Sequence, residues 1–302
     1  TSWSGAHKGR TVLRYRGGSE GFVTLVAASR IDSIRFADLH FDGRVSGDPT
    51  TWAAANHDRF TGAAGLSIDS CRGAVVSRCS AVDMRQHGFR LLKVHGGHIE
   101  KCVTRRSRGT FGDGFLILSS TDITVTDCVA EDYTRIGFVA DRTDVSEPMC
   151  QRITLRDCTA THGHHASTNY GGSEFNAGVW LENCTSALIE RVVTQDNPDR
   201  GINACTGKRT PDVGGAASIA VRDCRVNGGT FGICVYSLAD VPITATVSGC
   251  TVERALIAFQ AAANNGADVF AWSDCRASYD ASAANGRGFA TEVTAAVQGK
   301  PS

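Results

Sequence analysis

The chain has 302 residues, and its 31 basic and 31 acidic side chains give a net charge of zero. A balanced charge argues against nucleic acid or an anionic membrane surface as the main partner, because such binding uses a concentrated basic patch. No run of about 18 apolar residues is present, so no transmembrane helix is expected.

One short pattern recurs nine times, an apolar residue followed three positions later by a small apolar residue. The first members are Phe36, Val76, Ile99, Val125, Leu155, Ile189, Val221, Val247 and Trp272. The second members are Leu39, Cys79, Cys102, Cys128, Cys158, Val192, Cys224, Cys250 and Cys275. Successive second members lie between 23 residues (Cys79 to Cys102) and 40 residues (Leu39 to Cys79) apart, a spacing typical of a solenoid, a propeller or an array.

A glycine followed by a large apolar residue also recurs once in most of these units. The pairs begin at Gly65, Gly88, Gly114, Gly137, Gly178, Gly201, Gly232 and Gly288. Short stretches of period-2 alternation follow, and no window sustains the spacing of a long helix. We therefore expect an all-β fold, a right-handed parallel β-helix of about nine coils with about three short strands per coil. It should form a single domain over residues 1–302, with a cap or strand over about 1–20 and a tail over about 290–302.

Units such as Ile123-Thr-Val-Thr-Asp-Cys128 and Phe36-Ala-Asp-Leu-His-Phe-Asp-Gly43 resemble the repeats of the pectin-lyase-like superfamily, over roughly residues 20–295. The resemblance implies a right-handed parallel β-helix. That superfamily contains lyases, hydrolases, epimerases, esterases and phage or adhesin modules. The Arg-x-Pro-x-x-Arg motif of pectate lyases, the Asp-Pro-His motif of alginate epimerases and the polygalacturonase motifs are not matched, so no catalytic residue is carried over.

The twelve cysteines are expected to be mainly structural. Seven of them occupy the column that also accepts leucine and valine, which indicates small apolar core positions. Neighbours in the column should lie about 4.8 Å apart, farther than the roughly 3.8 Å between Cβ atoms that a disulfide prefers. The column should therefore be reduced and free of metal. Five cysteines lie off the column, and a single disulfide among them is left open: Cys71, Cys150, Cys184, Cys205 and Cys234.

Insertions interrupt the repeat at about 43–62, 141–150, 161–176 and 206–215. Three of the four fall in consecutive units, and loops on both borders should wall the outer face of the glycine-led sheet. Long loops on a rigid scaffold commonly carry binding and catalytic groups. We therefore expect the functional site on this face.

Side chains alternate across a strand, so the positions two and four residues after each glycine should point outward. The first set is Ser67, Arg90, Leu116, Val139, Trp180, Asn203 and Cys234, and the second is Asp69, Leu92, Leu118, Asp141, Glu182, Cys205 and Tyr236. Asp141 and Glu182 should lie roughly 5 Å apart, as in a retaining glycosidase, or be bridged by arginine or Ca²⁺. Trp180 could stack on a sugar ring or be covered by a loop.

The loop over 161–176 holds His164, His165 and Tyr170, residue types suited to proton transfer. These histidines could instead be solvated or bind zinc with a carboxylate such as Glu174. Other candidate substrate-binding residues are the basic loop residues Arg142, Lys208 and Arg209, the face residues Arg90 and Asn203, and a weaker border set of His87, Asp113 and Arg200.

Two chemistries fit these residues. Proton abstraction next to a carboxylate, as in a polysaccharide lyase or C5-epimerase, needs a base, a cation and often a tyrosine acid such as Tyr170 or Tyr236. Glycoside hydrolysis would rely on Asp141 and Glu182. The first is favoured, with an acidic glycan as substrate and no cofactor. A non-catalytic glycan-binding or structural module and a small-molecule isomerase or cyclase remain alternatives. Localisation is open, because the fold favours secretion by analogy whereas reduced cysteines suit the cytoplasm.

Overall fold

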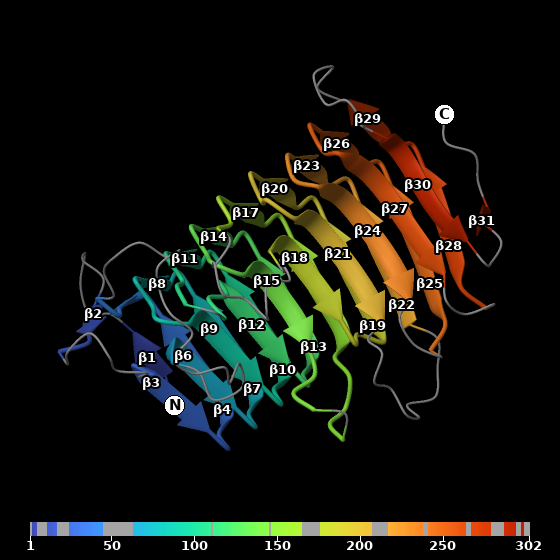
Figure 1. Ribbon diagram of the computed structural model, residues 1–302. Coiled ribbons are helices and arrows are strands. Elements are labelled where there is room, and N and C mark those ends of the chain that lie inside the picture. The colour runs from blue at the N-terminus through green and yellow to red at the C-terminus, as the bar shows by residue number, and fades with distance from the viewer. Residues whose placement is uncertain are drawn as a thin grey trace.

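In the computed structural model the chain winds into a parallel β-helix whose coils stack from the N-terminal end to the C-terminal end (Figure 1). The structure describes residues 2–4, 11–16, 24–44, 63–109, 111–144, 146–164, 176–206, 217–237, 241–263, 267–278, 287–293 and 297–298. Within these ranges every strand belongs to one of three parallel sheets, and no helix is present that could cross a membrane.

Sheet A contains the strands that carry the first members of the repeated pattern, each as the second-to-last residue of its strand. Its order is β1 (Ser2–Ser4), β4 (Asp32–Ala37), β7 (Arg72–Ser77), β10 (His95–Glu100), β13 (Thr121–Thr126), β16 (Gln151–Arg156), β19 (Ser186–Glu190), β22 (Ala217–Arg222), β25 (Ile243–Ser248), β28 (Val269–Ser273) and β31 (Val297–Gln298). The predicted ladder is confirmed throughout, since Phe36 pairs with Val76 and each later member pairs with the next, as far as Trp272.

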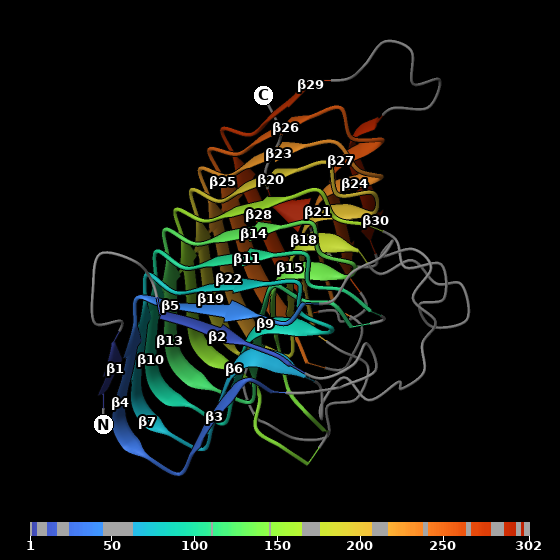
Figure 2. The ribbon, with the colours of Figure 1, turned by 90° about the vertical axis from the view of Figure 1, so that its left-hand side faces the viewer.

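Sheet B is made of short strands, and from β8 onward each follows its sheet A strand after a two-residue corner. Its order is β2 (Thr11–Arg14), β5 (Leu39–Asp42), β8 (Ser80–Val82), β11 (Val103–Arg105), β14 (Val129–Glu131), β17 (Thr159–Thr161), β20 (Val193–Gln195), β23 (Arg225–Asn227), β26 (Thr251–Glu253) and β29 (Arg276–Ser278). Figure 2 shows these strands stacked along one side of the coil.

Sheet C holds the glycine-led strands. Its order is β3 (Val26–Ser29), β6 (Ala64–Asp69), β9 (His87–Leu92), β12 (Phe115–Leu118), β15 (Ile136–Asp141), β18 (Ala177–Glu182), β21 (Arg200–Thr206), β24 (Phe231–Ser237), β27 (Ile257–Ala263) and β30 (Arg287–Val293). A Cβ on Gly88 would lie 2.3 Å from a Thr104 methyl carbon, and a Cβ on Gly201 would lie 2.3 Å from one of Val226. Glycine recurs here because sheet B side chains fill the space that a side chain would need.

The corner between sheets A and B places one residue per coil in the left-handed backbone region. Its non-glycine members have φ between 51° and 57°: Asp38, Arg78, Lys101, Asp127, Asp157, Arg191, Asp223 and Asp274. Opposite charges meet on neighbouring coils, as in the 2.7 Å contacts of Arg78 with Asp38 and of Arg191 with Asp157. These ion pairs are exposed, so each should contribute little to stability.

The cysteine column is buried as predicted, and all twelve cysteines are free thiols. Each thiol in the column lies near the carbonyl two residues earlier, and the Cys128 Sγ lies 3.1 Å from the Thr126 oxygen. Burial raises the pKa of Cys128, so the thiol stays protonated and can act as a weak donor. The off-column Cys150 and Cys184 form a similar interior pair at the corner between sheets C and A.

Candidate functional site

The outer face of sheet C carries the two predicted columns of side chains in the predicted register. Trp180 pairs with Asn203, which pairs with Cys234, and Cys205 pairs with both Glu182 and Tyr236. Figure 1 shows the strands concerned, β15 to β27, side by side from green to orange. The repeat pattern therefore predicts correctly which residues share this face.

Most of the outward-pointing side chains in the middle of this face are buried. The outward side chains there form a second apolar cluster, separate from the interior core: Leu116, Leu118, Ile136, Val139, Ala177, Trp180 and Cys205. Trp180 is only 6% exposed, and Asn203 is fully buried. Apolar side chains on neighbouring strands pack against one another, which removes them from contact with water. The alternation within a single strand does not reveal this packing between strands.

Arg200 forms the centre of a polar cluster on the same face, which we call the Arg200 site: Trp180, Arg200, Asn203, Phe231 and Tyr236. Arg200 Nη1 donates hydrogen bonds to Asn203 Oδ1 at 2.7 Å and to the Tyr236 hydroxyl oxygen at 2.9 Å. The guanidinium carbon lies 4.9 Å from the ring centroid of Trp180, 5.5 Å from Phe231 and 5.6 Å from Tyr236. The geometry is that of a cation held among three aromatic rings.

The charge state of the Arg200 site follows from its surroundings. Burial alone would lower the pKa of Arg200, but Tyr236, Cys234 and Asp199 outweigh it, so the pKa is raised and the side chain stays cationic. The Arg200 Nε lies 3.5 Å from the Asp199 carboxylate without hydrogen-bond alignment. Burial raises the pKa of Tyr236 and raises that of Cys234 to about 12, so both groups stay protonated at neutral pH.

Arg200 is accessible, unlike most of this face. Its side chain is 20% exposed. Among the described residues, both hydrogen bonds that it donates come from Nη1, and neither comes from Nη2. Nη2 is therefore the atom through which the planar guanidinium could bind a ligand carboxylate.

Trp180 is not an open platform for a sugar ring. Arg200 lies over its ring, and the indole Nε1 donates to Glu182 Oε2 at 3.1 Å. The interpretation of Trp180 as a sugar-stacking platform is therefore not supported, and most of the 161–176 loop that was the alternative cover lies outside the described residues. The contact of Trp180 with Arg200 orients the guanidinium instead.

Asp141 and Glu182 lie at corresponding positions of neighbouring strands, because the preceding residues Ala140 and Leu181 are paired. Asp141 is 3% exposed, and its Oδ1 accepts hydrogen bonds from the Asn183 side chain at 2.8 Å and from the Arg142 backbone at 2.7 Å. Arg142, predicted from the sequence to bind substrate, is also buried at 4% exposure. Asp141 therefore has a structural environment, and its catalytic role stays a prediction. In the part of the chain that is described, no group of three or more histidine, cysteine or acidic residues is arranged to hold a metal ion.

A second polar cluster lies nearer the N-terminal end of sheet C, where His87 and Asp113 are fully buried. Arg135 binds both oxygens of Asp113, with 2.7 Å between Nε and Oδ1, and His87 Nδ1 lies 3.3 Å from Asp113 Oδ2. Arg90 donates to Ser67 Oγ at 3.1 Å. The expectation that His87 and Asp113 bind substrate at the border of the site is wrong in this structure. Arg135 binds the Asp113 carboxylate, and the surrounding protein shields both residues from solvent.

The predicted proton-transfer loop is described only at its start. His164 is 39% exposed, and its Nε2 lies 3.2 Å from Asp132 Oδ1, a carboxylate that can orient the ring. His165, Tyr170, Lys208 and Arg209 lie outside the described residues. Their predicted roles stay predictions.

Sequence reasoning placed Arg200 only in a weaker border set and missed Phe231 and Arg135. The reason is local: a Cβ at each strand glycine would point inward, as does the residue after it, so the residue before the glycine faces outward. Simple alternation assigns that residue to the interior. The glycine of each strand is the signal that could have identified Arg200 and Phe231. If the glycine is assigned to the interior, the residue before it is assigned to the outer face.

Comparison with known proteins supports the fold. No curated protein matches this sequence. The tailspike gp61 of Pseudomonas phage phi297 is 13% identical, with 84% of this chain aligned to 41% of the tailspike at a TM-score of 0.55. An exopolygalacturonase from Thermotoga maritima is 13% identical, with 83% of this chain aligned to 72% of that chain at a TM-score of 0.49. The mannuronan C-5 epimerase AlgE4 A-module of Azotobacter vinelandii is 13% identical, with 97% of this chain aligned to 80% of that chain at a TM-score of 0.46. Both TM-scores are lower than that of the tailspike.

At these identities the likeness concerns the fold, and the chain spans less than half of the tailspike. A family model described as the right-handed β-helix region matches residues 64–279, which is most of the chain and includes both polar clusters of sheet C. The parallel pairing of every described strand agrees with that match. The chain belongs to the right-handed β-helix family.

Proposed function

We propose that this protein acts on an acidic glycan by removing a proton next to a carboxylate, as a polysaccharide lyase or C5-epimerase does. The observation that carries the proposal is the Arg200 site, in which a half-buried cation contacts a protonated tyrosine. The superfamily resemblance and the β-helix neighbours make a glycan a reasonable substrate class, by analogy of fold.

Arg200 would bind the uronate carboxylate. A proton on the adjacent carbon becomes acidic only if the negative charge that develops on the carboxylate is stabilised. A guanidinium fixed by two hydrogen bonds and three aromatic rings can do this without reorganising during the reaction. Its low exposure strengthens the electrostatic effect.

Tyr236 would supply the acid. Its oxygen accepts a hydrogen bond from Arg200, so its own O–H can still donate. In elimination, a base takes the carbon-bound proton, the electron pair forms the new C–C double bond, and the departing glycosidic oxygen takes the proton of Tyr236. In epimerisation the carbon itself is reprotonated from the opposite side. The base is assigned from sequence to His164 or His165.

The test is to incubate the protein with uronate polysaccharides and with matched neutral ones, and to follow unsaturated products, C5 inversion and new reducing ends separately. Arg200→Gln and Tyr236→Phe should each lower turnover by about 100-fold or more, the usual scale for such groups. Arg222→Gln, at an exposed arginine of β22, is the matched control and should behave as wild type.

Other outcomes would redirect the proposal. New reducing ends without unsaturation, lost in Asp141→Asn and Glu182→Gln but kept in Arg200→Gln, would identify a hydrolase. Binding of an acidic glycan without any product would indicate a non-catalytic module. Full activity of the Arg200 and Tyr236 variants would place the reaction elsewhere.

A further inference from the structure

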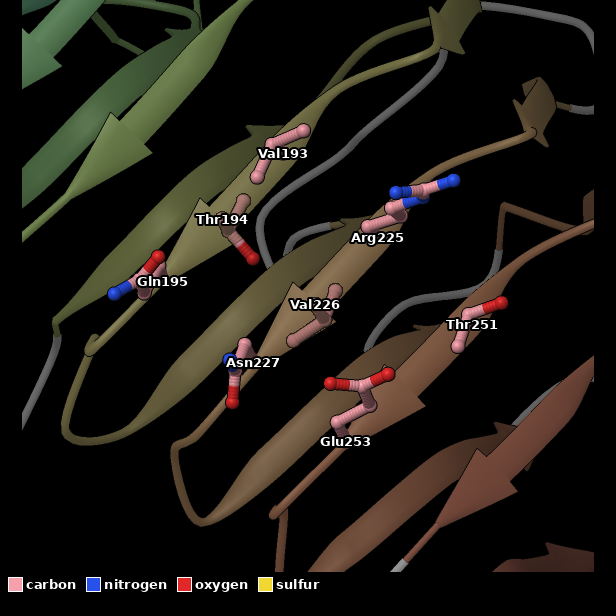
Figure 3. A pocket seen from close by; sticks show the side chains of 8 residues that line it. All are labelled: Val193, Thr194, Gln195, Arg225, Val226, Asn227, Thr251 and Glu253. Carbon is pink, nitrogen blue, oxygen red and sulfur yellow. The ribbon is translucent and has the colours of Figure 1, made fainter.

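A shallow groove of about 440 Å³ lies on the outer face of sheet B, a different sheet from the Arg200 site. Its lining comes from β20, β23 and β26: Val193, Thr194, Gln195, Arg225, Val226, Asn227, Thr251 and Glu253 (Figure 3). The volume falls within the range of small-ligand sites.

Two rows of outward side chains define the groove. Register places Val193, Arg225 and Thr251 in one row, and Gln195, Asn227 and Glu253 in the other. Thr194 and Val226, between the rows, are buried and form the floor. A ligand lying along the coil axis would thus meet a new pair of side chains at each strand, about 4.8 Å apart.

The amide side chains are held in fixed orientations by neighbours outside the groove. Gln195 Nε2 donates to Asp196 Oδ2 at 2.9 Å, and Asn227 Oδ1 accepts from Arg254 Nε at 2.6 Å. The opposite ends, an acceptor on Gln195 and a donor on Asn227, remain for a ligand. Adjacent donors and acceptors suit hydroxyl groups, which both give and receive hydrogen bonds.

Arg225 and Glu253 add one charge of each sign. Both are exposed, and neither forms an ion pair with a residue that the structure describes. Elsewhere on sheet B, Arg105 and Glu131 pair at 2.7 Å across neighbouring strands. The groove therefore keeps a cation and an anion apart while carrying no net charge.

Two other classes of occupant fit poorly. The groove strands are hydrogen-bonded on both sides, so a peptide cannot add as a further strand. The lining has no aromatic anchor of the kind that dominates protein interfaces. Zero net charge gives no attraction for a polyanion such as nucleic acid.

We propose that the sheet B groove binds a short stretch of neutral glycan along the coil axis. Its side-chain amides, Thr251, Arg225 and Glu253 would hydrogen-bond the ring hydroxyls, and exposed Val193 would contact a sugar face. This site is independent of the chemistry at the Arg200 site, because the two lie on different sheets.

The test uses the whole chain and isothermal titration calorimetry with soluble hexasaccharides of glucose, mannose and xylose, with an oligogalacturonate as the acidic comparison. At least one neutral hexasaccharide should bind, and Arg225→Ala and Glu253→Gln should each weaken it about tenfold or more. Arg72→Ala, at an exposed arginine of β7, is the matched control and should change nothing, as should Arg200→Gln.

Three results would overturn the proposal: no binding of any neutral hexasaccharide, binding that is unchanged in both groove variants, or loss of neutral binding in Arg200→Gln. Binding of only the oligogalacturonate, abolished by Arg225→Ala but not by Glu253→Gln, would contradict it too, because the ligand would then be an anion.

Discussion

Arg135 lies directly before β15 and Arg200 opens β21, two strands of sheet C, and the two arginines differ in what surrounds them. Arg135 is 6% exposed and binds both oxygens of a buried carboxylate, so its charge is neutralised within the protein. Arg200 is 20% exposed and bonds through one nitrogen to a neutral amide and a neutral phenol. The first arrangement stabilises a fold, and the second leaves a cation with unused capacity to bind an anion.

The largest expected effect is on stability at the Arg135 cluster. Asp113→Ala would leave the buried Arg135 guanidinium without its carboxylate and should lower the free energy of unfolding by about 3–5 kcal/mol. Asp122→Ala is the control, because Asp122 is 51% exposed in its ion pair with Arg152, and its loss of stability should be much smaller. Urea unfolding of both variants measures the difference. Equal losses of unfolding free energy in the two variants would contradict a special structural role for the buried Arg135 cluster.

Exchanging each arginine for lysine should separate the two roles. Arg200→Lys keeps the charge but loses the planar fork and the stacking on three rings, so kcat/KM on an acidic glycan should fall about 10- to 100-fold with little change in melting temperature. Arg135→Lys should instead lower the melting temperature, since one ammonium group cannot replace a bidentate contact. A loss of stability in Arg200→Lys but not in Arg135→Lys would contradict the structural role of Arg135 and the ligand-binding role of Arg200.

Acid should weaken the Arg135 cluster before it affects the Arg200 site. Burial lowers the pKa of His87, so below about pH 6.5 the unfolded chain binds a proton that the folded protein resists, and stability falls as pH falls. Burial opposes ionisation of Asp113, but Arg135 and His87 still lower its pKa, which adds a further loss below about pH 4. Urea midpoints between pH 7.5 and 5.5 should drop for wild type and drop less for His87→Gln, and parallel curves would argue against this account.

The sequence predicts the coils, the three strands per coil and the order of residues on sheet C, because glycine spacing and the apolar columns depend on contacts between successive coils. It does not predict exposure on sheet C. Leu116 and Trp180 become buried through packing with side chains from other coils, and Asp141 is covered and bonded by Asn183. Arg200 faces outward because both Gly201 and Ile202 are directed toward the interior. A strict two-residue alternation places neighbouring residues on opposite faces and therefore does not predict this.

The smallest expected effect lies in the interior column. Cys128→Val removes weak contacts to the oxygens of Thr126 and Ile99 at 3.1 and 3.7 Å but nearly conserves volume. It should cost at most about 1.5 kcal/mol and leave activity unchanged. Thiol titration of the denatured, unreduced protein should find twelve free thiols in wild type and eleven in the variant. Fewer free thiols would reveal disulfides and contradict the packing role of the column.

The in-register stacking of sheet C also bears on how the molecule can come apart. Each coil touches mainly the coils before and after it, so unfolding can begin at either end and fray inward. In sheet C, the strands β24, β27 and β30 separate β21, which carries Arg200, from the C-terminal end of the sheet. The strands from β3 to β18 separate it from the N-terminal end. A coil lost from either end would leave the strands around Arg200 paired, and amide hydrogen exchange should therefore be slower in β21, where the proposed chemistry takes place, than in the terminal strands β3 and β30.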